Sequence, residues 1–245
     1  MATGQPPHTV VTLCWSQVEP TRGDYDDGAV DEIITAVRGA RATGIEPFVV
    51  LHDGGFPDWV IERHGWLDPD VLAAWGCYVD RVAQRAGVHV RRWVPIRGPF
   101  EEAAWYDREG KAVLRVLLEA HAIAYLHLRR SQGHGGSAPD VGTIATWGRA
   151  PVGARERARR AVGVGEGADA WVKVLATGTL APPFALFGEL PNGTPALDFI
   201  GVEWGGPEGA AAATVQRLEA WGKRVFRVGG GQAWATLPPP AQSPP

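Results

Sequence analysis

Short apolar segments alternate with longer helical patterns along most of the chain, and this alternation limits the possible folds more than any other feature. The apolar segments are rich in valine and bounded by turn residues, as buried strands are. They cover residues 9–14, 46–51, 88–96, 142–147, 197–204 and 223–228. Helical spacing lies between them, in residues 30–40, 70–86, 111–130 and 208–221. Such alternation predicts βαβ units and a parallel sheet.

A parallel sheet of this kind either closes into a (β/α) barrel of the TIM type or stays open and doubly wound. An open nucleotide-binding sheet carries a glycine-rich phosphate loop between its first strand and the next helix, and this chain has none there. The pattern therefore favours an α/β fold of the TIM-barrel type over residues 1–236. Residues 237–245 are rich in proline and are expected to be disordered.

Composition excludes several classes of function. The 245 residues are 45% hydrophobic and carry a net charge of -3, which fits one globular domain and gives no electrostatic reason to expect nucleic acid or an anionic membrane as partner. No apolar run reaches the roughly 18 residues of a membrane span, and no secretory signal is visible, so we expect a cytoplasmic protein. Cys14 and Cys77 lack metal-like spacing and are expected to be buried free thiols. We expect no metal and no cofactor.

Five stretches, in one order along the chain, resemble glycoside hydrolase family 1, whose best-known members are β-glucosidases. They are CWSQVEP with the following RG, GIEP through LH with the later GW, LLEAH, DFIGV and WGK, which together lie between Cys14 and Lys223. The resemblance implies a (β/α) barrel with the family's second to seventh strands. Nothing in the chain matches the family's first and eighth strands, so the barrel is expected to be incomplete.

The two glutamates that perform retaining hydrolysis in this family, at the ends of strands four and seven, have no counterpart here. The motif of the acid/base reads WVPIRGP in this chain, which places Arg97 at an asparagine and Gly98 at the glutamate. The motif of the nucleophile reads RVGGG, which places Gly229 at the second glutamate. Because glycine supplies neither a proton nor a nucleophile, the resemblance implies that ordinary glycosidase chemistry is lost.

Candidate site residues follow from the rule that parallel barrels keep function at the carboxyl ends of their strands. Glu203 and Asp53 are the tentative catalytic residues. Arg97 offers a fixed donor fork to an anionic or carbonyl-bearing ligand, or else balances the charge of these carboxylates. The other candidate substrate-binding residues are Trp15, Gln17, His52, Trp147 and Trp204.

Two further expectations concern residues beside these candidates. Neighbouring strand residues point to opposite faces, so only one of His52 and Asp53 can face the site. The resemblance implies that Asp53 faces it and that His52 packs behind. Glu101 and Glu102, in the loop after Pro99, are expected to be solvated.

Three functions remain open at this point. The leading one is a degenerate family 1-like protein that binds a glycoside or similar polyhydroxylated small molecule. The alternatives are a repurposed enzyme that performs proton-transfer chemistry on a small metabolite, and a structural or relic protein without a small ligand. The missing strands leave a sheet edge that could be covered by the segment before Thr9, by residues 182–195 or by a second copy of the chain. Of these we prefer a homodimer.

Overall fold

The structure is a computed structural model, and it describes residues 9–147, 167–178, 195–205 and 208–228. Gly229, the expected tail and most of residues 182–195 lie outside this part of the chain.

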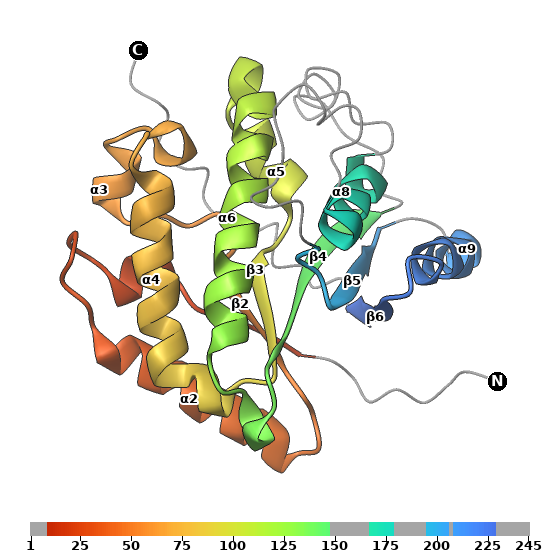
Figure 1. The fold of residues 1–245 in the computed structure, drawn as a ribbon, viewed down its shortest axis with the longest axis horizontal. Coiled ribbons are helices and arrows are strands. Elements are labelled where there is room, and N and C mark those ends of the chain that lie inside the picture. Colours follow the sequence, from red (N-terminus) through yellow and green to blue (C-terminus); the bar gives the residue numbers. More distant parts are fainter. Residues whose placement is uncertain (1–8, 148–166, 179–194, 206–207, 229–245) are drawn as a thin grey trace.

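One curled, fully parallel sheet forms the framework (Figure 1). Its strands follow one another in chain order: β1 (Val10–Thr12), β2 (Phe48–His52), β3 (Arg92–Ile96), β4 (Asp140–Trp147), β5 (Phe199–Trp204) and β6 (Arg224–Val228). They are the six predicted strands, with differences only at their ends. Within the described residues no pairing joins β6 back to β1, so the sheet is a half-barrel, which confirms the predicted incomplete TIM-type fold.

Helices cover the outer face of this sheet (Figure 1). Within residues 9–147, 167–178, 195–205 and 208–228, the helices of four residues or more are α1 (Trp15–Val18), α2 (Asp27–Ala42), α3 (Asp58–Ile61), α4 (Val71–Ala86), α5 (Pro99–Ala104), α6 (Gly110–Arg130), α8 (Gly167–Thr177) and α9 (Glu208–Glu219). Sequence periodicity predicted α2, α4, α6 and α9. It missed α1, α3 and α5, which are too short to show a helical period, and α8. In the described part of the chain, no helix is long and apolar enough to cross a membrane.

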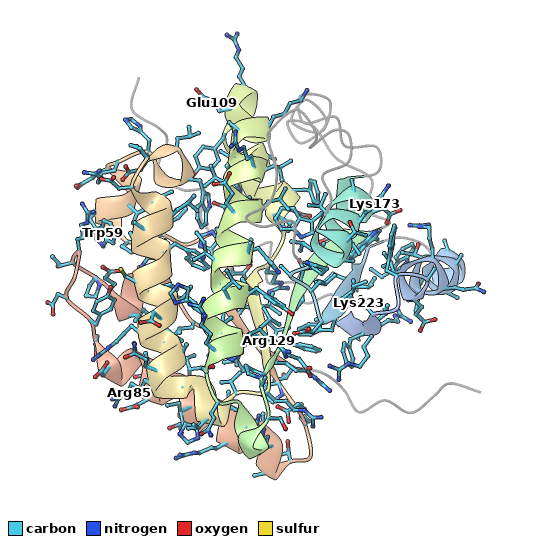
Figure 2. The ribbon with its side chains drawn as sticks, viewed as in Figure 1. Trp59, Arg85, Glu109, Arg129, Lys173 and Lys223 are labelled. Carbon is cyan, nitrogen blue, oxygen red and sulfur yellow. The ribbon has the colours of Figure 1, made fainter. Side chains whose placement is uncertain are left out.

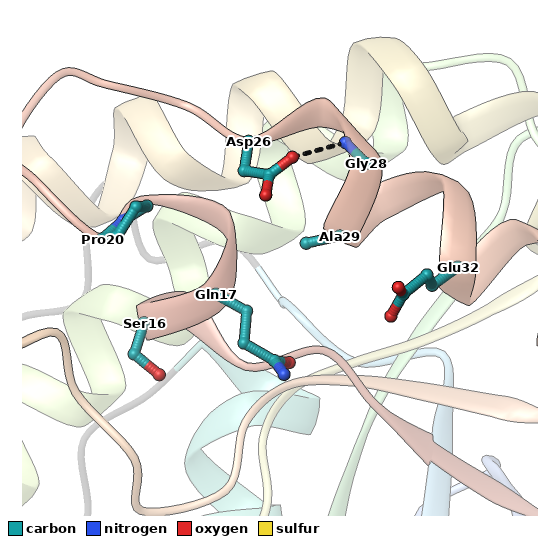
Figure 3. Close-up of a pocket in the computed structure, with 7 residues that line it drawn as sticks. All are labelled: Ser16, Gln17, Pro20, Asp26, Gly28, Ala29 and Glu32. Carbon is teal, nitrogen blue, oxygen red and sulfur yellow. Dashed lines mark hydrogen bonds between the residues drawn. The ribbon is translucent and has the colours of Figure 1, made fainter.

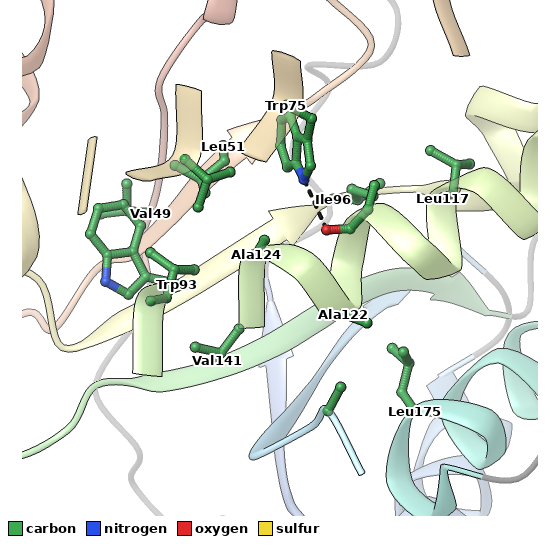
Figure 4. Packing of buried hydrophobic residues seen from close by; sticks show 14 of the residues in the cluster. Val49, Leu51, Trp75, Trp93, Ile96, Leu117, Ala122, Ala124, Val141 and Leu175 are labelled. Atoms are coloured by element: carbon green, nitrogen blue, oxygen red, sulfur yellow. Dashed lines mark hydrogen bonds between the residues drawn. The ribbon is translucent and has the colours of Figure 1, made fainter. Parts of the chain in front are cut away.

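The main hydrophobic core lies between the outer face of the sheet and these helices (Figure 4). Trp75 of α4, Trp93 of β3 and Leu117 of α6 are fully buried in it. The indole of Trp75 donates a hydrogen bond to the carbonyl of Ala120 at 2.8 Å, which ties α4 to α6 and satisfies the one polar atom of this side chain. Dense packing and the satisfied donor fix the helical layer against the sheet.

A second, smaller core fills the inner face of the half-barrel. The rings of Phe48, Phe199 and Phe226 lie 5.2 to 5.7 Å apart, although they come from β2, β5 and β6. The curl of the sheet therefore brings distant strands face to face. A Cβ at Gly142 would lie 2.4 Å from the Phe199 carbonyl oxygen, and one at Gly201 would lie 2.6 Å from Ile144. Glycine is required at both positions for this layer to pack.

The two cysteines are free thiols, as expected. Cys14, the residue just before α1, is partly buried, whereas Cys77 is exposed. The expectation of a buried thiol is wrong for Cys77, because this residue lies on the solvent-facing side of the amphipathic helix α4.

A buried histidine on α6 makes the stability of the fold depend on pH. His121 is fully buried, its Nε2 lies 2.9 Å from the carbonyl oxygen of Ala196, and burial lowers its pKa to about 4. The unfolded chain takes up this proton near pH 6.5, so acidification between about pH 6.5 and about pH 4 favours unfolding. We expect a loss of about 2 kcal/mol in unfolding free energy between about pH 7.5 and about pH 5 from this residue.

Urea denaturation at the two pH values measures this loss. The His121→Gln variant keeps a donor for Ala196 and does not titrate, so its unfolding free energy should depend less on pH by the same amount. An identical pH dependence in both proteins would show that His121 is not responsible.

Candidate functional site

Five polar side chains, Thr12, Asp53, Arg97, Thr146 and Glu203, lie at or just after the carboxyl ends of β1 to β5, and we call them the polar layer. Arg97 is at its centre. The Nε of Arg97 donates to Glu203 Oε1 at 2.9 Å, its Nη2 donates to the same oxygen, and its Nη1 donates to Asp53 Oδ2 at 3.0 Å. Arg97 is 5% exposed and Glu203 4% exposed, so this ion pair is as buried as the core.

The threonines complete the polar layer, in which one carboxylate oxygen has no hydrogen-bond partner among the described residues. Thr146 Oγ1 lies 3.4 Å from Glu203 Oε2, and Thr12 Oγ1 lies 3.5 Å from Asp53 Oδ2. The second carboxylate oxygen of Asp53, Oδ1, is buried without a hydrogen-bond partner among the described residues. The layer thus combines fixed donors with an unused acceptor, the mixture that a hydroxyl group can bind.

Gly98 shapes the turn between β3 and α5. Its φ of 62° and ψ of 51° are left-handed, a conformation that costs other residues roughly 1–2 kcal/mol. Its N–H donates to the carbonyl of Ile144 at 3.0 Å, while the N–H of Arg97 donates to the carbonyl of His52 at 3.0 Å. These bonds hold Arg97 over the inner face, and Pro99 then starts the helix.

A second buried cluster lies beside Asp53 and was missed from the sequence. His52 is fully buried against the rings of Phe56 and Trp66, at centroid distances of 4.8 and 5.1 Å. Glu102 Oε1 accepts from Trp66 Nε1 at 3.0 Å and lies 3.5 Å from His52 Nε2. The expectation that Glu102 is solvated is wrong, because α5 turns it back toward the sheet. The sequence analysis missed this contact because it did not predict α5.

The candidate tryptophans lie on the helical side of the sheet, away from the polar layer's contacts. Trp15 is fully buried, stacks on Tyr78 and donates from its Nε1 to Glu19 at 2.8 Å. Trp147 is buried, and its Nε1 donates to Asp169 of α8 at 3.0 Å. Trp204 is partly buried and follows Glu203 on β5, in register with Trp147. Trp147 and Trp204 therefore lie on the opposite face of the sheet from Thr146 and Glu203.

Gln17 also lies apart from the polar layer. It is exposed on α1 and lines a shallow pocket of about 400 Å³ between α1 and the start of α2 (Figure 3). The pocket's lining residues are Ser16, Gln17, Pro20, Asp26, Gly28, Ala29 and Glu32. None of them belongs to the polar layer. Among the described residues no three His, Cys, Asp or Glu side chains gather as ligands for a metal ion.

Comparison with known proteins relates this geometry to a family. Beta-glucosidase 34 of Oryza sativa subsp. japonica is 26% identical over 133 residues, which are 53% of this chain and 25% of that protein. Beta-glucosidase 40 of Arabidopsis thaliana is 27% identical over 90 residues, 36% of this chain and 18% of that protein. No model of a known protein family matches the chain.

Two solved structures are similar to this chain in fold. A β-glycosidase from Pyrococcus horikoshii superposes with a TM-score of 0.70 at 17% identity, covering 89% of this chain and 60% of that one. The chain is similar to part of a family 1 β-glucosidase. The family 1 β-glucosidase from Thermotoga maritima has a TM-score of 0.63 at 17% identity, covering 81% of this chain and 50% of its own length. The predicted resemblance to family 1 is thereby confirmed, and the chain spans about half the length of that structure and about a quarter of the rice protein.

Proposed function

We propose that this family 1-like chain binds a glycoside or similar polyhydroxylated small molecule at the polar layer, without retaining hydrolysis. One observation carries the proposal. Next to Gly98, the residue matched to the family's acid/base glutamate, the inner face holds the guanidinium of Arg97 bound to Glu203 and Asp53. Such a cluster offers donors and acceptors to hydroxyl groups.

Loss of the acid/base supports the absence of hydrolysis. Retaining hydrolysis requires two carboxyl groups about 5 Å apart, one to protonate the leaving oxygen and one to attack the anomeric carbon. Gly98 occupies the matched acid/base position, and its left-handed backbone fits glycine rather than glutamate. Gly229 at the matched nucleophile position lies outside the described residues and rests on the sequence alone.

A ligand-observed NMR screen of glycosides, sugar acids and phenolic metabolites tests the proposal. We expect glycosides to bind, and Glu203→Gln to weaken their binding by about tenfold or more, because a charge-assisted hydrogen bond contributes about 1.5–3 kcal/mol. The matched control is Asp31→Asn, which removes an exposed carboxylate paired with Arg85 on the helical surface. Equal affinity in all three proteins would place the binding site elsewhere.

Proton-transfer chemistry on a small metabolite is the second candidate. The unused Oδ1 of Asp53 favours it, because a carboxylate oxygen without a partner in the described chain is free to accept a proton from a ligand. Incorporation of deuterium from solvent into a bound ligand, lost in Asp53→Asn, would favour this candidate. A homodimer and a cytoplasmic location remain further proposals.

A further inference from the structure

Glu102 is a buried carboxylate that the proposed binding of a ligand does not yet use. It is 6% exposed, whereas Glu109, at the start of α6, lies in solvent (Figure 2). Burial of a carboxylate seldom stabilises a fold more than an apolar side chain of similar size would. The contacts of Glu102 therefore indicate what its carboxylate does.

The carboxylate of Glu102 contacts both chain neighbours of Asp53. Its Oε1 accepts a hydrogen bond from Trp66 Nε1 at 3.0 Å and lies 3.5 Å from Nε2 of His52, the residue before Asp53. Its Oε2 lies beside Gly54, the residue after Asp53, at 3.5 Å from the point that a Cβ would occupy. The indole of Trp66 thus holds a carboxylate that bounds the backbone of Asp53 on both sides.

The backbone beside Asp53 needs such a support. Gly54 has a φ of 81°, and the residue after it is also glycine, so this turn has more conformational freedom than other sequences allow. Arg97 donates to Asp53 from Nη1, at 3.0 Å, but to Glu203 from both Nε and Nη2. The position of the Asp53 carboxylate therefore depends strongly on how its backbone is held.

Glu102 also links the two strand ends that carry Asp53 and Arg97. Its helix, α5, starts directly after Gly98, and the N–H of Glu102 donates to the carbonyl of Gly98 at 3.0 Å. The N–H of Arg97 donates to the carbonyl of His52 at 3.0 Å. The side chain of Glu102 adds a second connection between the end of β3 and the end of β2, and so helps to fix the separation of Arg97 and Asp53.

We propose that Glu102 is a positioning residue of the polar layer, which keeps Asp53 in contact with Arg97 by holding the residues on either side of Asp53. This role rests on the proposed function, since Glu102 affects a ligand only through Asp53. Side chains behind a binding group commonly set its orientation in this way. Here the support gives the Asp53 carboxylate one orientation toward the hydroxyl groups of a glycoside.

Two variants separate the contacts of Glu102 from its charge. Glu102→Gln keeps the length of the side chain and removes the charge, whereas Glu102→Asp keeps the charge and is one methylene too short to reach both His52 and Gly54. We expect Glu102→Gln to bind 4-nitrophenyl β-glucoside as the wild type does, and Glu102→Asp to bind it about fivefold or more weakly. In an Asp53→Ala background, Glu102→Asp should change the affinity less than about twofold, because the group through which it acts is absent.

A measurement without ligand distinguishes this role from the proposed function. The NMR signals of the Arg97 Nη1 protons report the contact with Asp53, and we expect them to shift in Glu102→Asp and in Asp53→Ala but not in Glu102→Gln. The matched control is Asp68→Asn, which alters another carboxylate that is 6% exposed and is held by Arg63. It should change neither the Arg97 signals nor the glucoside affinity.

The results that would overturn the positioning role are distinct from those that bear on the proposed function. Unchanged Arg97 signals in Glu102→Asp, even with a lower melting temperature, would show that Glu102 is purely structural. Equal glucoside affinity in the wild type and Glu102→Asp, or an equal loss in both Glu102 variants, would also overturn the role. Shifted Arg97 signals in a protein that binds no glycoside would overturn the proposed function and leave the support of Asp53 by Glu102 intact.

Discussion

Replacing Arg97 by methionine is expected to lower the free energy of unfolding by about 3–5 kcal/mol. The guanidinium holds two carboxylates, Asp53 and Glu203, that are both removed from water. Without it two mostly buried carboxylates lose the cation that both of them contact, and this cost is larger than the loss of an exposed ion pair. Urea denaturation at neutral pH, monitored by tryptophan fluorescence, measures the change.

Two companion variants determine whether the cost comes from burial. Arg85→Met breaks an ion pair whose side chains are 37% and 53% exposed, and should cost far less than Arg97→Met. Adding Glu203→Leu to Arg97→Met should recover part of the lost stability, since one stranded charge is removed. A cost below about 1 kcal/mol for Arg97→Met alone would mean that water solvates the polar layer.

Hydrolysis of aryl β-glucosides and β-galactosides is expected not to exceed background. Glycosidases owe their acceleration, at least about a millionfold for typical enzymes, to chemistry that needs both carboxylates. Glycine stands at both matched positions, 98 and 229. A chromogenic assay with excess protein over long incubation measures the residual rate.

Reintroducing one carboxylate tests how complete the loss is. Gly98→Glu alone should remain inactive, because it provides an acid without a nucleophile, and its backbone must also leave the left-handed region or be strained there. Turnover in the wild type that disappears in Glu203→Gln would show that the chemistry has moved to Glu203. Turnover restored by Gly98→Glu alone would show that a nucleophile survives outside the position matched here.

The strands and the grouping of three polar residues could be predicted because both depend on local pattern and on one general rule. Apolar segments bounded by turns identified all six strands, and the rule that barrel function lies at strand ends brought Asp53, Arg97 and Glu203 into one group. The structure places these three in direct contact.

Contacts that depend on unpredicted helices could not be foreseen. Glu102 returns to His52 because α5 forms, and Trp147 turns to the helical side because Asp169 on α8 accepts its N–H. Neither partner is recognisable from spacing, since α5 is six residues long and Asp169 is 22 residues from Trp147. Trp15 and Gln17 similarly follow the short helix α1, which directs one into the core and the other to the surface.

The central claim is that the polar layer binds a glycoside without cleaving it. The most direct measurement is an NMR titration with 4-nitrophenyl β-glucoside that follows the Arg97 Nε–Hε signal while absorbance records any release of nitrophenol. We predict a saturable shift of the Arg97 signal, weakened in Glu203→Gln, with no nitrophenol above background. Nitrophenol release by the wild type, or binding that shifts only signals around Gln17 and leaves Arg97 unchanged, would contradict the claim.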